Sequence, residues 1–97
     1  RIVVLGDMLE LGDASEAQHR NLGYKCSSSN LDVVFTLGEN AFFIKESVKG
    51  IKKNHHFEIR KDLINSLKLE LKENDKVLFK GSRGMKMEEI IEGVFGE

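Results

Sequence analysis

Apolar residues in this chain form two kinds of pattern, short continuous runs and longer stretches in which they recur every three or four positions. Three of the continuous runs, Ile2–Leu5, Val33–Leu37 and Val77–Lys80, are dominated by Val, Leu, Ile and Phe. Such runs predict strands that are buried on both faces of a parallel sheet. A fourth run, His55–Ile59, is more polar, and we expect it to be a strand at one edge of the sheet.

Between and after these runs, apolar side chains recur at the spacing of one helix face, which predicts four helices. The residues expected to face inward are His19, Leu22, Gly23 and Cys26 in the first helix, Ala41, Ile44 and Val48 in the second, Leu63, Ile64, Leu67 and Leu71 in the third, and Met87, Ile90, Ile91 and Val94 in the fourth.

Polar residues and glycines mark where two of these helices begin and end. Asn40 and Asp62 are the expected N-caps of the second and third helices, and Gly50 is the expected stop of the second. Gly23 lies in the interior of the first helix, where glycine costs roughly 1 kcal/mol relative to alanine. We therefore expect the backbone at Gly23 to pack closely against a neighbouring element or a ligand.

Strand and helix patterns alternate along the chain without room for hairpins, which predicts a parallel sheet with helices on both faces. Right-handed crossovers carry the first three strands outward in order, and the polar third strand then forms one edge. The fourth strand must lie beside the first, which gives the spatial order 3-2-1-4. We therefore expect an α/β fold, a three-layer α/β/α Rossmann-like domain. Ligands of such sheets bind where the winding reverses, here between the first and fourth strands.

In this order the fourth strand is an apolar strand at an exposed edge, which complete proteins avoid. We therefore expect further strands beside it, supplied by sequence upstream of Arg1, so that the sheet is truncated on its N-terminal side. Residues 1–97 are expected to form one domain of a longer protein.

Composition excludes several classes of protein. The chain has 15 Lys and Arg against 16 Asp and Glu, for a formal net charge of -1. This balance gives no support for binding to nucleic acid or to an acidic membrane surface through bulk charge. No apolar run approaches the length of a membrane span, and no signal-peptide pattern is present. Cys26 is the single cysteine, which excludes an internal disulfide framework and fits a reducing cytoplasm.

The turn between the fourth strand and the last helix is the first candidate for a functional site. Lys80, Arg83 and Lys86 crowd the N-terminus of that helix, where the helix dipole disfavours cations. An anionic ligand bound in the turn would account for at least the first two, and Lys86 fits a surface residue better. The alternative is a solvated basic loop in which Gly81 and Gly84 serve only as turn residues.

A second candidate loop, Gly6–Gly12, follows the first strand and contains the two acids Asp7 and Glu10. Because the carboxyl ends of the first and fourth strands meet at the reversal, we expect the acidic loop and the basic turn to face one crevice. His19 lies on the inner face of the next helix. We expect it to brace the loop through a hydrogen bond rather than to act as a catalytic base.

Ser82 and the pair His55 and His56 are further polar candidates for ligand binding. The Ser82 hydroxyl can donate to the same anion as the basic side chains or cap the following helix, and the sequence leaves both open. His55 and His56 are adjacent on a strand, so their side chains point to opposite faces and do not suit a shared metal. We expect no metal site among these residues.

The two loops and the first helix together resemble those of the Mur ligase family. The similarity is to the C-terminal domain of the members that add D-alanyl-D-alanine to UDP-N-acetylmuramoyl-tripeptide, and it spans essentially the whole chain. The segments that carry it are Gly6-Asp7-Met8-Leu9-Glu10-Leu11-Gly12, the helix with Ser15, Glu16, His19 and Gly23, and Lys80-Gly81-Ser82-Arg83-Gly84-Met85-Lys86-Met87-Glu88.

The resemblance implies a cytoplasmic enzyme of peptidoglycan synthesis. In that family ATP phosphorylates the terminal carboxylate of the UDP-linked tripeptide, and the amine of D-alanyl-D-alanine then attacks the acyl phosphate. The resemblance also implies that a central domain binds most of the ATP and Mg²⁺ and that the C-terminal domain closes over it. This chain has no G-x-x-x-x-G-K-[ST] phosphate loop, so the fragment alone is expected to be inactive.

The resemblance suggests roles for the polar residues of both loops. Lys80 and Arg83 are expected to hold the γ-phosphate, the acyl phosphate or the dipeptide carboxylate, with Ser82 on the same anion. Asp7 and Glu10 are expected to orient the incoming ammonium or to contact the nucleotide ribose. For Glu10 the alternative is an ion pair with Arg83 or Lys80.

Other functions stay open at this point. The chain also suits another Mur-type or polyglutamate-type ligase, or a structural interaction domain whose crevice is unused. A stand-alone receiver-like regulatory module shares the parallel architecture and the acidic first loop. A receiver needs an acceptor Asp at the end of its third strand, where this chain has Ile59-Arg60-Lys61.

Overall fold

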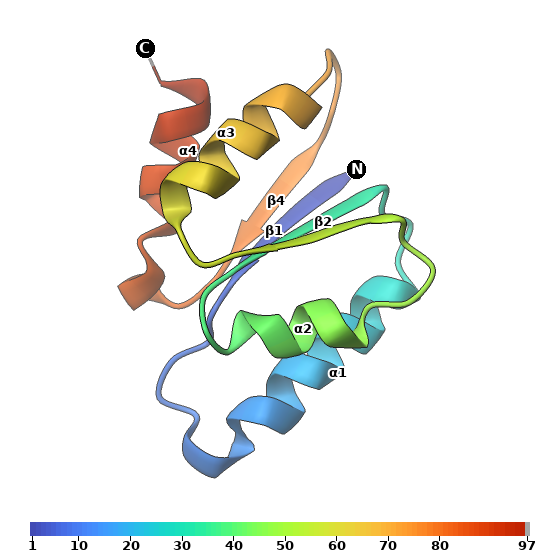
Figure 1. The fold of residues 1–97 in the computed structure, drawn as a ribbon, viewed down its shortest axis with the longest axis vertical. Helices are drawn as coiled ribbons and strands as arrows, with labels where there is room; N and C mark the ends of the chain where they lie inside the picture. The colour runs from blue at the N-terminus through green and yellow to red at the C-terminus, as the bar shows by residue number, and fades with distance from the viewer. Residues whose placement is uncertain (97) are drawn as a thin grey trace.

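The computed structural model describes residues 1–96, in which strands and helices alternate (Figure 1). The elements are β1 (Ile2–Gly6), α1 (Ser15–Ser27), β2 (Val33–Leu37), α2 (Ala41–Ser47), β3 (Lys53–Phe57), α3 (Arg60–Glu70), β4 (Val77–Lys80) and α4 (Met87–Phe95). Short 3₁₀ turns at Gly12–Ala14 and Arg83–Met85 precede α1 and α4. Each strand and helix that the hydrophobic pattern predicts is therefore present.

The four strands form one parallel sheet in the order β3-β2-β1-β4, which confirms the predicted topology. β1 lies between β2 and β4, and its residue Val4 pairs with Phe35 on one side and Phe79 on the other. The winding reverses between β1 and β4, so the loops that follow these two strands leave the sheet side by side.

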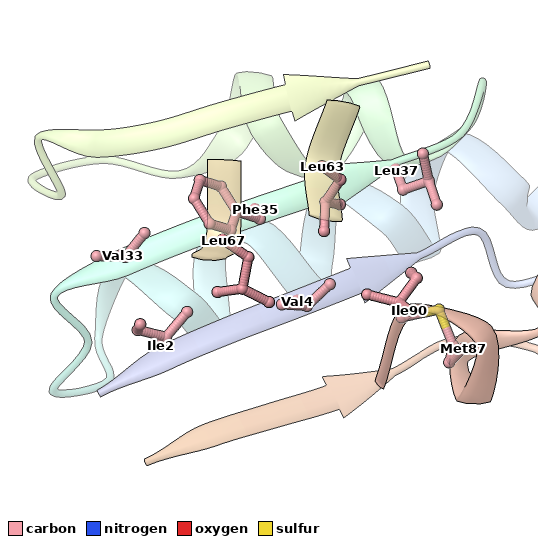
Figure 2. Close-up of a cluster of buried hydrophobic side chains, with 9 residues drawn as sticks. All are labelled: Ile2, Val4, Val33, Phe35, Leu37, Leu63, Leu67, Met87 and Ile90. Carbon is pink, nitrogen blue, oxygen red and sulfur yellow. The ribbon is translucent and has the colours of Figure 1, made fainter. Parts of the chain in front are cut away.

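Helices cover both faces of the sheet, α1 and α2 on one side and α3 and α4 on the other (Figure 1). Because side chains alternate along a strand, neighbouring residues of β1 and β2 enter different cores. The core under α1 and α2 contains Val3, Leu5, Cys26, Val34, Ala41, Ile44 and Val48. The core under α3 and α4, drawn in Figure 2, contains Ile2, Val4, Val33, Phe35, Leu37, Leu63, Leu67, Met87 and Ile90. The expected three-layer architecture is confirmed.

Gly23 of α1 allows the first two helices to approach each other closely, as its position predicted. A Cβ at Gly23 would lie 2.6 Å from the carbonyl oxygen of Ile44 and 2.7 Å from the Cβ of Ser47, both in α2. Any side chain at this position would therefore push α1 and α2 apart.

The third strand lies two residues earlier than the sequence pattern predicted. β3 spans Lys53–Phe57 rather than His55–Ile59, and it is an edge strand as expected. Its register pairs it end to end with β2, so the two strands stop together. Ile59 instead occupies the N-cap position of α3 with 58% of its surface exposed. Ile59 extended the apolar pattern of the third strand in the sequence, although it belongs to the cap of α3.

Two predicted helix boundaries are also wrong. α3 begins at Arg60, so Asp62 lies in its first turn, where the Asp62 N–H donates to the Ile59 carbonyl. α2 ends at Ser47, three residues before Gly50. The chain leaves the helix at Val48, whose extended backbone turns its side chain into the core between α1, α2 and the sheet. Burial of Val48, rather than glycine, therefore ends α2.

β4 forms the second edge of the sheet and keeps apolar surface exposed. Val77 and Phe79 pack towards α4, whereas Leu78 points to the other face and is 62% exposed. Phe79 contacts Phe95 of α4 edge to face, with ring centroids 6.4 Å apart. Within residues 1–96, no helix combines the length and the apolar composition that crossing a membrane requires.

Candidate functional site

The acidic loop and the basic turn are bonded to each other at the carboxyl ends of β1 and β4. The Ser82 N–H donates to the carbonyl of Asp7 at 3.0 Å. The Leu9 N–H donates to the Ser82 hydroxyl oxygen at 2.7 Å. The Ser82 side chain makes no cap bond to the turn that follows it, so its partner is the acidic loop. The two segments therefore form one structural unit.

Glycines let the two segments approach this closely. A Cβ at Gly81 would lie 3.0 Å from the Met87 sulfur and 3.3 Å from the Cα of Gly6. A Cβ at Gly84 would lie 2.7 Å from a terminal methyl carbon of Leu9. The close approach of Gly6, Met87 and Leu9 leaves little room for a side chain at Gly81 or Gly84, so packing as well as turn flexibility explains both glycines.

Asp7 has a partner that the sequence did not suggest. Its carboxylate is buried and accepts the Ala41 N–H at 2.6 Å and the Asn40 N–H at 3.2 Å, at the start of α2. Asn40 occupies the predicted N-cap position, but its own side chain makes no cap bond. The cap of α2 is thus supplied from the end of β1, and the Asp7 carboxylate faces a helix terminus rather than open crevice.

His19 ties the acidic loop to α1. The side chain is fully buried, and its Nε2 accepts the Met8 N–H at 3.0 Å. Its Nδ1 lies 2.6 Å from the Ser15 carbonyl oxygen, which can only accept, so Nδ1 carries the proton. Both ring nitrogens of the neutral imidazole are occupied, and His19 is arranged as a brace of the loop.

A cavity of about 520 Å³ opens between the two segments. Its lining consists of Leu9 and Glu10 from the acidic loop and Ser82, Arg83 and Gly84 from the basic turn. Glu10 and Arg83 are both exposed, and within residues 1–96 neither forms an ion pair. The alternative of an ion pair between Glu10 and a cation of the turn is therefore absent from the described structure. The cavity presents one free carboxylate, one free guanidinium and an apolar wall.

Ion pairs that shift pKa values lie elsewhere on the surface. The hydrogen bond that Arg20 donates to the Glu16 carboxylate, supported by a second one to Glu46, raises the pKa of Arg20 on the outer side of α1 and α2. The hydrogen bond that Lys53 donates to the Glu70 carboxylate raises the pKa of Lys53 at the amino end of β3. These cations are committed to protein carboxylates, in contrast to Arg83.

Lys80 does not share the cavity with Arg83. Residues alternate along β4, so Lys80 follows Leu78 onto the face that carries α1. There it lines a separate, mostly apolar cavity of about 190 Å³ with Val3, Leu5, Leu22, Lys25, Cys26, Ser29, Leu31 and Leu78. The sequence placed both cations in one turn, and the strand alternation separates them.

The backbone is unusual on both sides of the cavity. Glu10 has φ +64° and Lys86 has φ +51°, values that residues other than glycine rarely adopt, and Gly12 has φ +58°. The Lys86 side chain is 62% exposed, with its ammonium 4.0 Å from Glu89. A left-handed backbone thus puts Glu10 at the tip of the acidic loop, and it makes Lys86 a turn residue.

Arg60 is a site residue that sequence reasoning missed. It begins α3, and its guanidinium donates to the Met85 carbonyl at 2.9 Å and pairs with Glu89 at 3.2 Å. These contacts fix the basic turn to α3. The signal that could have found Arg60 is the one that pointed to the basic turn, a cation placed at a helix N-terminus against the dipole.

The adjacent histidines of β3 have separate protein partners. His55 stacks at a tilt against Phe35, while His56 bonds to the Thr36 hydroxyl at 2.7 Å and pairs with Glu58. Across the described part of the chain, no group of three His, Cys, Asp or Glu side chains could hold a metal ion.

Comparison with known proteins places the chain in one family. Residues 1–83 match the family model described as Mur ligase, glutamate ligase domain. The chain is 44% identical over 94 residues to the UDP-N-acetylmuramoyl-tripeptide–D-alanyl-D-alanine ligase of Bacillus subtilis (strain 168), covering 94% of this chain and 21% of that protein. The Escherichia coli (strain K12) ligase of the same name is 37% identical over 93 residues, covering 94% of this chain and 20% of that protein. The chain thus spans about a fifth of the length of the curated relatives that it matches.

Solved structures give the same result. MurF from Acinetobacter baumannii superposes with a TM-score of 0.84 at 27% identity, covering 100% of this chain and 22% of that chain. MurF ligase from Thermotoga maritima, in complex with ADP, superposes with a TM-score of 0.79 at 29% identity, covering 96% of this chain and 21% of that chain. The strand order and both loops therefore sit in a fold that these ligases share.

Proposed function

This chain belongs to the Mur ligase family, and from that premise we propose that it is the C-terminal domain of a ligase that joins D-alanyl-D-alanine to UDP-N-acetylmuramoyl-tripeptide. The observation that carries the proposal is the 44% identity, over 94% of this chain, to the Bacillus subtilis ligase of that name. The reaction forms an amide bond in peptidoglycan synthesis, and we place it in the cytoplasm, which suits the free thiol of Cys26.

In the proposed reaction a terminal carboxylate oxygen of the tripeptide bonds to the γ-phosphorus of ATP as the bond to the bridging oxygen breaks, and ADP leaves. The dipeptide amine, once it has lost a proton, attacks the acyl carbon. The amide bond forms as the bond from that carbon to the phosphate oxygen breaks, and phosphate leaves. This chain contributes by binding and orienting the amine substrate, because its cavity carries charges of both signs and no phosphate loop.

We assign the cavity between the acidic loop and the basic turn to the dipeptide. The Arg83 guanidinium suits the dipeptide carboxylate because its planar fork donates two parallel hydrogen bonds. Ser82 accepts from Leu9 through its oxygen and keeps its own hydroxyl proton to donate to the same carboxylate. Glu10 faces the ammonium from the other segment, and Leu9 contacts a methyl side chain of the substrate.

The nucleotide is assigned mainly to the rest of the longer protein. Thermotoga maritima MurF was solved with ADP, which supports ATP as the co-substrate here. Mg²⁺ accompanies ATP in the proposed reaction and would neutralise phosphate charge. The described residues offer no cluster of three metal-ligating side chains, so we assign no step to a metal held by this chain. Lys80, on the other face of β4, is assigned a long-range electrostatic role only.

The test is a reconstituted assay with the complete ligase that carries this chain. We expect phosphate release and a product of the corresponding mass when ATP, UDP-N-acetylmuramoyl-tripeptide and D-alanyl-D-alanine are all present. L-Alanyl-L-alanine is the matched control and should give no product. Absence of dipeptide-dependent phosphate release would overturn the proposal.

A glutamate-adding ligase is the second candidate, because the matching family model is described as a glutamate ligase domain. The same assay with D- or L-glutamate in place of the dipeptide separates the two. Product with glutamate and none with the dipeptide would establish the second candidate. The 97-residue chain alone is proposed to be inactive with any of these amines, because it lacks a phosphate loop.

A further inference from the structure

Asp7 lies where three segments of the fold meet. Its carboxylate accepts N–H groups at the start of α2, and its carbonyl accepts the Ser82 N–H of the basic turn. We propose that Asp7 is a positioning residue, which acts through these bonds to hold the basic turn where substrate binding requires it. The proposal rests on the proposed function because it concerns the same cavity, and it replaces the expected role of Asp7 as a ligand.

The Asp7 carboxylate is committed to the protein. The residue is 5% exposed, and each carboxylate oxygen accepts one backbone N–H, from Ala41 at 2.6 Å and from Asn40 at 3.2 Å. Turning the carboxylate towards a substrate ammonium would leave both N–H groups without this partner. A buried donor without a partner is costly, because it has given up its hydrogen bond to water and gained none in return. The bonded orientation is therefore the stable one, and direct contact with a ligand is disfavoured.

The neighbouring loop is shaped around the Asp7 side chain. Gly38 directly follows β2 and has φ +117°, and a Cβ at this position would overlap the Asp7 carboxylate. Both the conformation and the missing side chain of Gly38 therefore make room for the carboxylate at the start of α2. This close fit between Gly38 and the Asp7 carboxylate indicates that the carboxylate occupies this position permanently.

The backbone of the same residue carries the connection to the cavity. Asp7 accepts the Ser82 N–H at 3.0 Å, and two residues later the Leu9 N–H donates to the Ser82 hydroxyl oxygen at 2.7 Å. Ser82 is thus held from both sides by the acidic loop. Because Arg83 directly follows Ser82, a shift of Asp7 is passed within one residue to the cation of the cavity.

The test weakens the contact between the Asp7 carboxylate and the start of α2, first by changing Asp7 and then by changing Asn40. Asp7→Asn is nearly isosteric and keeps one oxygen acceptor, but it opposes an NH₂ group to a backbone N–H of α2. Asn40→Pro removes one of the two N–H groups that donate to the Asp7 carboxylate, keeps the Ala41 N–H, and leaves Asp7 itself unchanged. The φ of Asn40 is -79°, close to the value that proline imposes. Asn40→Ala keeps that N–H, and it loses no side-chain cap bond, so it is the matched control.

The first readout is the kinetics of the complete ligase that carries this chain. We expect kcat/KM for the dipeptide to fall about tenfold in Asp7→Asn and about threefold in Asn40→Pro, the scale of one lost hydrogen bond each. KM for ATP should stay within about twofold. The two effects should be non-additive in the double variant, since both break one contact. If Asn40→Pro behaves like Asn40→Ala, Asp7 does not act through α2 and the proposal is overturned.

The second readout does not depend on activity. We expect amide hydrogen exchange at Ser82 to quicken in Asp7→Asn and Asn40→Pro but not in Asn40→Ala, measured on the same protein. Unchanged protection of Ser82 in both test variants would overturn the positioning role, whichever amine the enzyme uses. Faster exchange at Ser82, in a protein whose unsubstituted form shows no dipeptide-dependent turnover, would support the positioning role and reject the proposed function.

Discussion

The two segments that enclose the cavity are held in opposite ways. The acidic loop, residues 6–12, is fixed by buried groups, with Asp7 bonded to α2 and His19 bonded to the loop backbone. The basic turn, residues 80–86, is fixed through its backbone, by Ser82 on one side and Arg60 on the other. Its side-chain cation Arg83 is left exposed and without an ion pair in the described structure.

Buried polar groups hold the two segments in place, and exposed charged groups are left to bind a ligand. Charged groups of the acidic loop that are buried act on the protein itself, as the Asp7 carboxylate does. Charged groups that are exposed, Glu10 and Arg83, remain available to a ligand. Substitutions in the framework should therefore change stability first, and substitutions of the exposed cation should change catalysis alone.

The largest expected effect is on stability, from His19→Ala. The substitution empties a fully buried site and leaves the Met8 N–H without its acceptor. Together a cavity and a lost buried hydrogen bond should lower the free energy of unfolding by about 2–4 kcal/mol. Chemical denaturation of the 97-residue chain measures this. Gln18→Ala, an exposed neighbour on the same helix, is the control and should change it by less than about 0.5 kcal/mol. A loss below about 1 kcal/mol in His19→Ala would contradict the bracing role.

Arg83→Ala should have the opposite profile. Losing one charge-assisted contact to the substrate should lower kcat/KM for the dipeptide on the order of 10- to 100-fold in the complete ligase. The melting temperature should stay unchanged, because Arg83 makes no ion pair within residues 1–96. Lys86→Ala, in the same turn, is the charge-matched control and should have little effect on kcat/KM. Equal kinetics for the Arg83 and Lys86 variants would remove Arg83 from the site.

Lys80→Ala should have the smallest effect of the three substitutions, and it tests whether Lys80 and Arg83 differ in function as they differ in position. Its side chain lies across β4 from the cavity, on the face that carries α1. Lys80 is exposed and lies outside the dipeptide cavity, so solvent and salt screen its charge, and kcat/KM for the dipeptide should fall less than about threefold. A loss as large as that of Arg83→Ala would mean that Lys80 reaches the substrate, and the two cations would then act as one group.

The sheet could be predicted from the sequence because its signals are local. A polar third run and a strongly apolar fourth run are visible along the chain, and right-handed crossovers then allow one order. The sheet has the predicted order, β3-β2-β1-β4. The loops after β1 and β4 meet as a result. The position of the candidate site thus follows from the hydrophobic pattern together with the handedness of the crossovers.

The contacts inside the site could not be predicted in the same way, because they join distant residues. Asp7 caps a helix that begins 34 residues later, and no local pattern distinguishes a cap supplied by another strand from one supplied by Asn40. The predicted bounds of the third strand are wrong for a related reason, since the register of β3 with β2 decides where β3 ends. Arg60 does carry a local signal, because it is a cation at the first position of α3, but its partner Met85 lies 25 residues further along the chain.

A crystal structure of the complete ligase with a non-hydrolysable ATP analogue and D-alanyl-D-alanine would show directly which residues hold the dipeptide. We expect the dipeptide carboxylate within hydrogen-bond distance of the Arg83 guanidinium, its ammonium towards Glu10, and the Asp7 carboxylate still bonded to the start of α2. A dipeptide bound away from the cavity between residues 6–12 and residues 80–86, or an Asp7 side chain turned onto the substrate, would contradict this expectation.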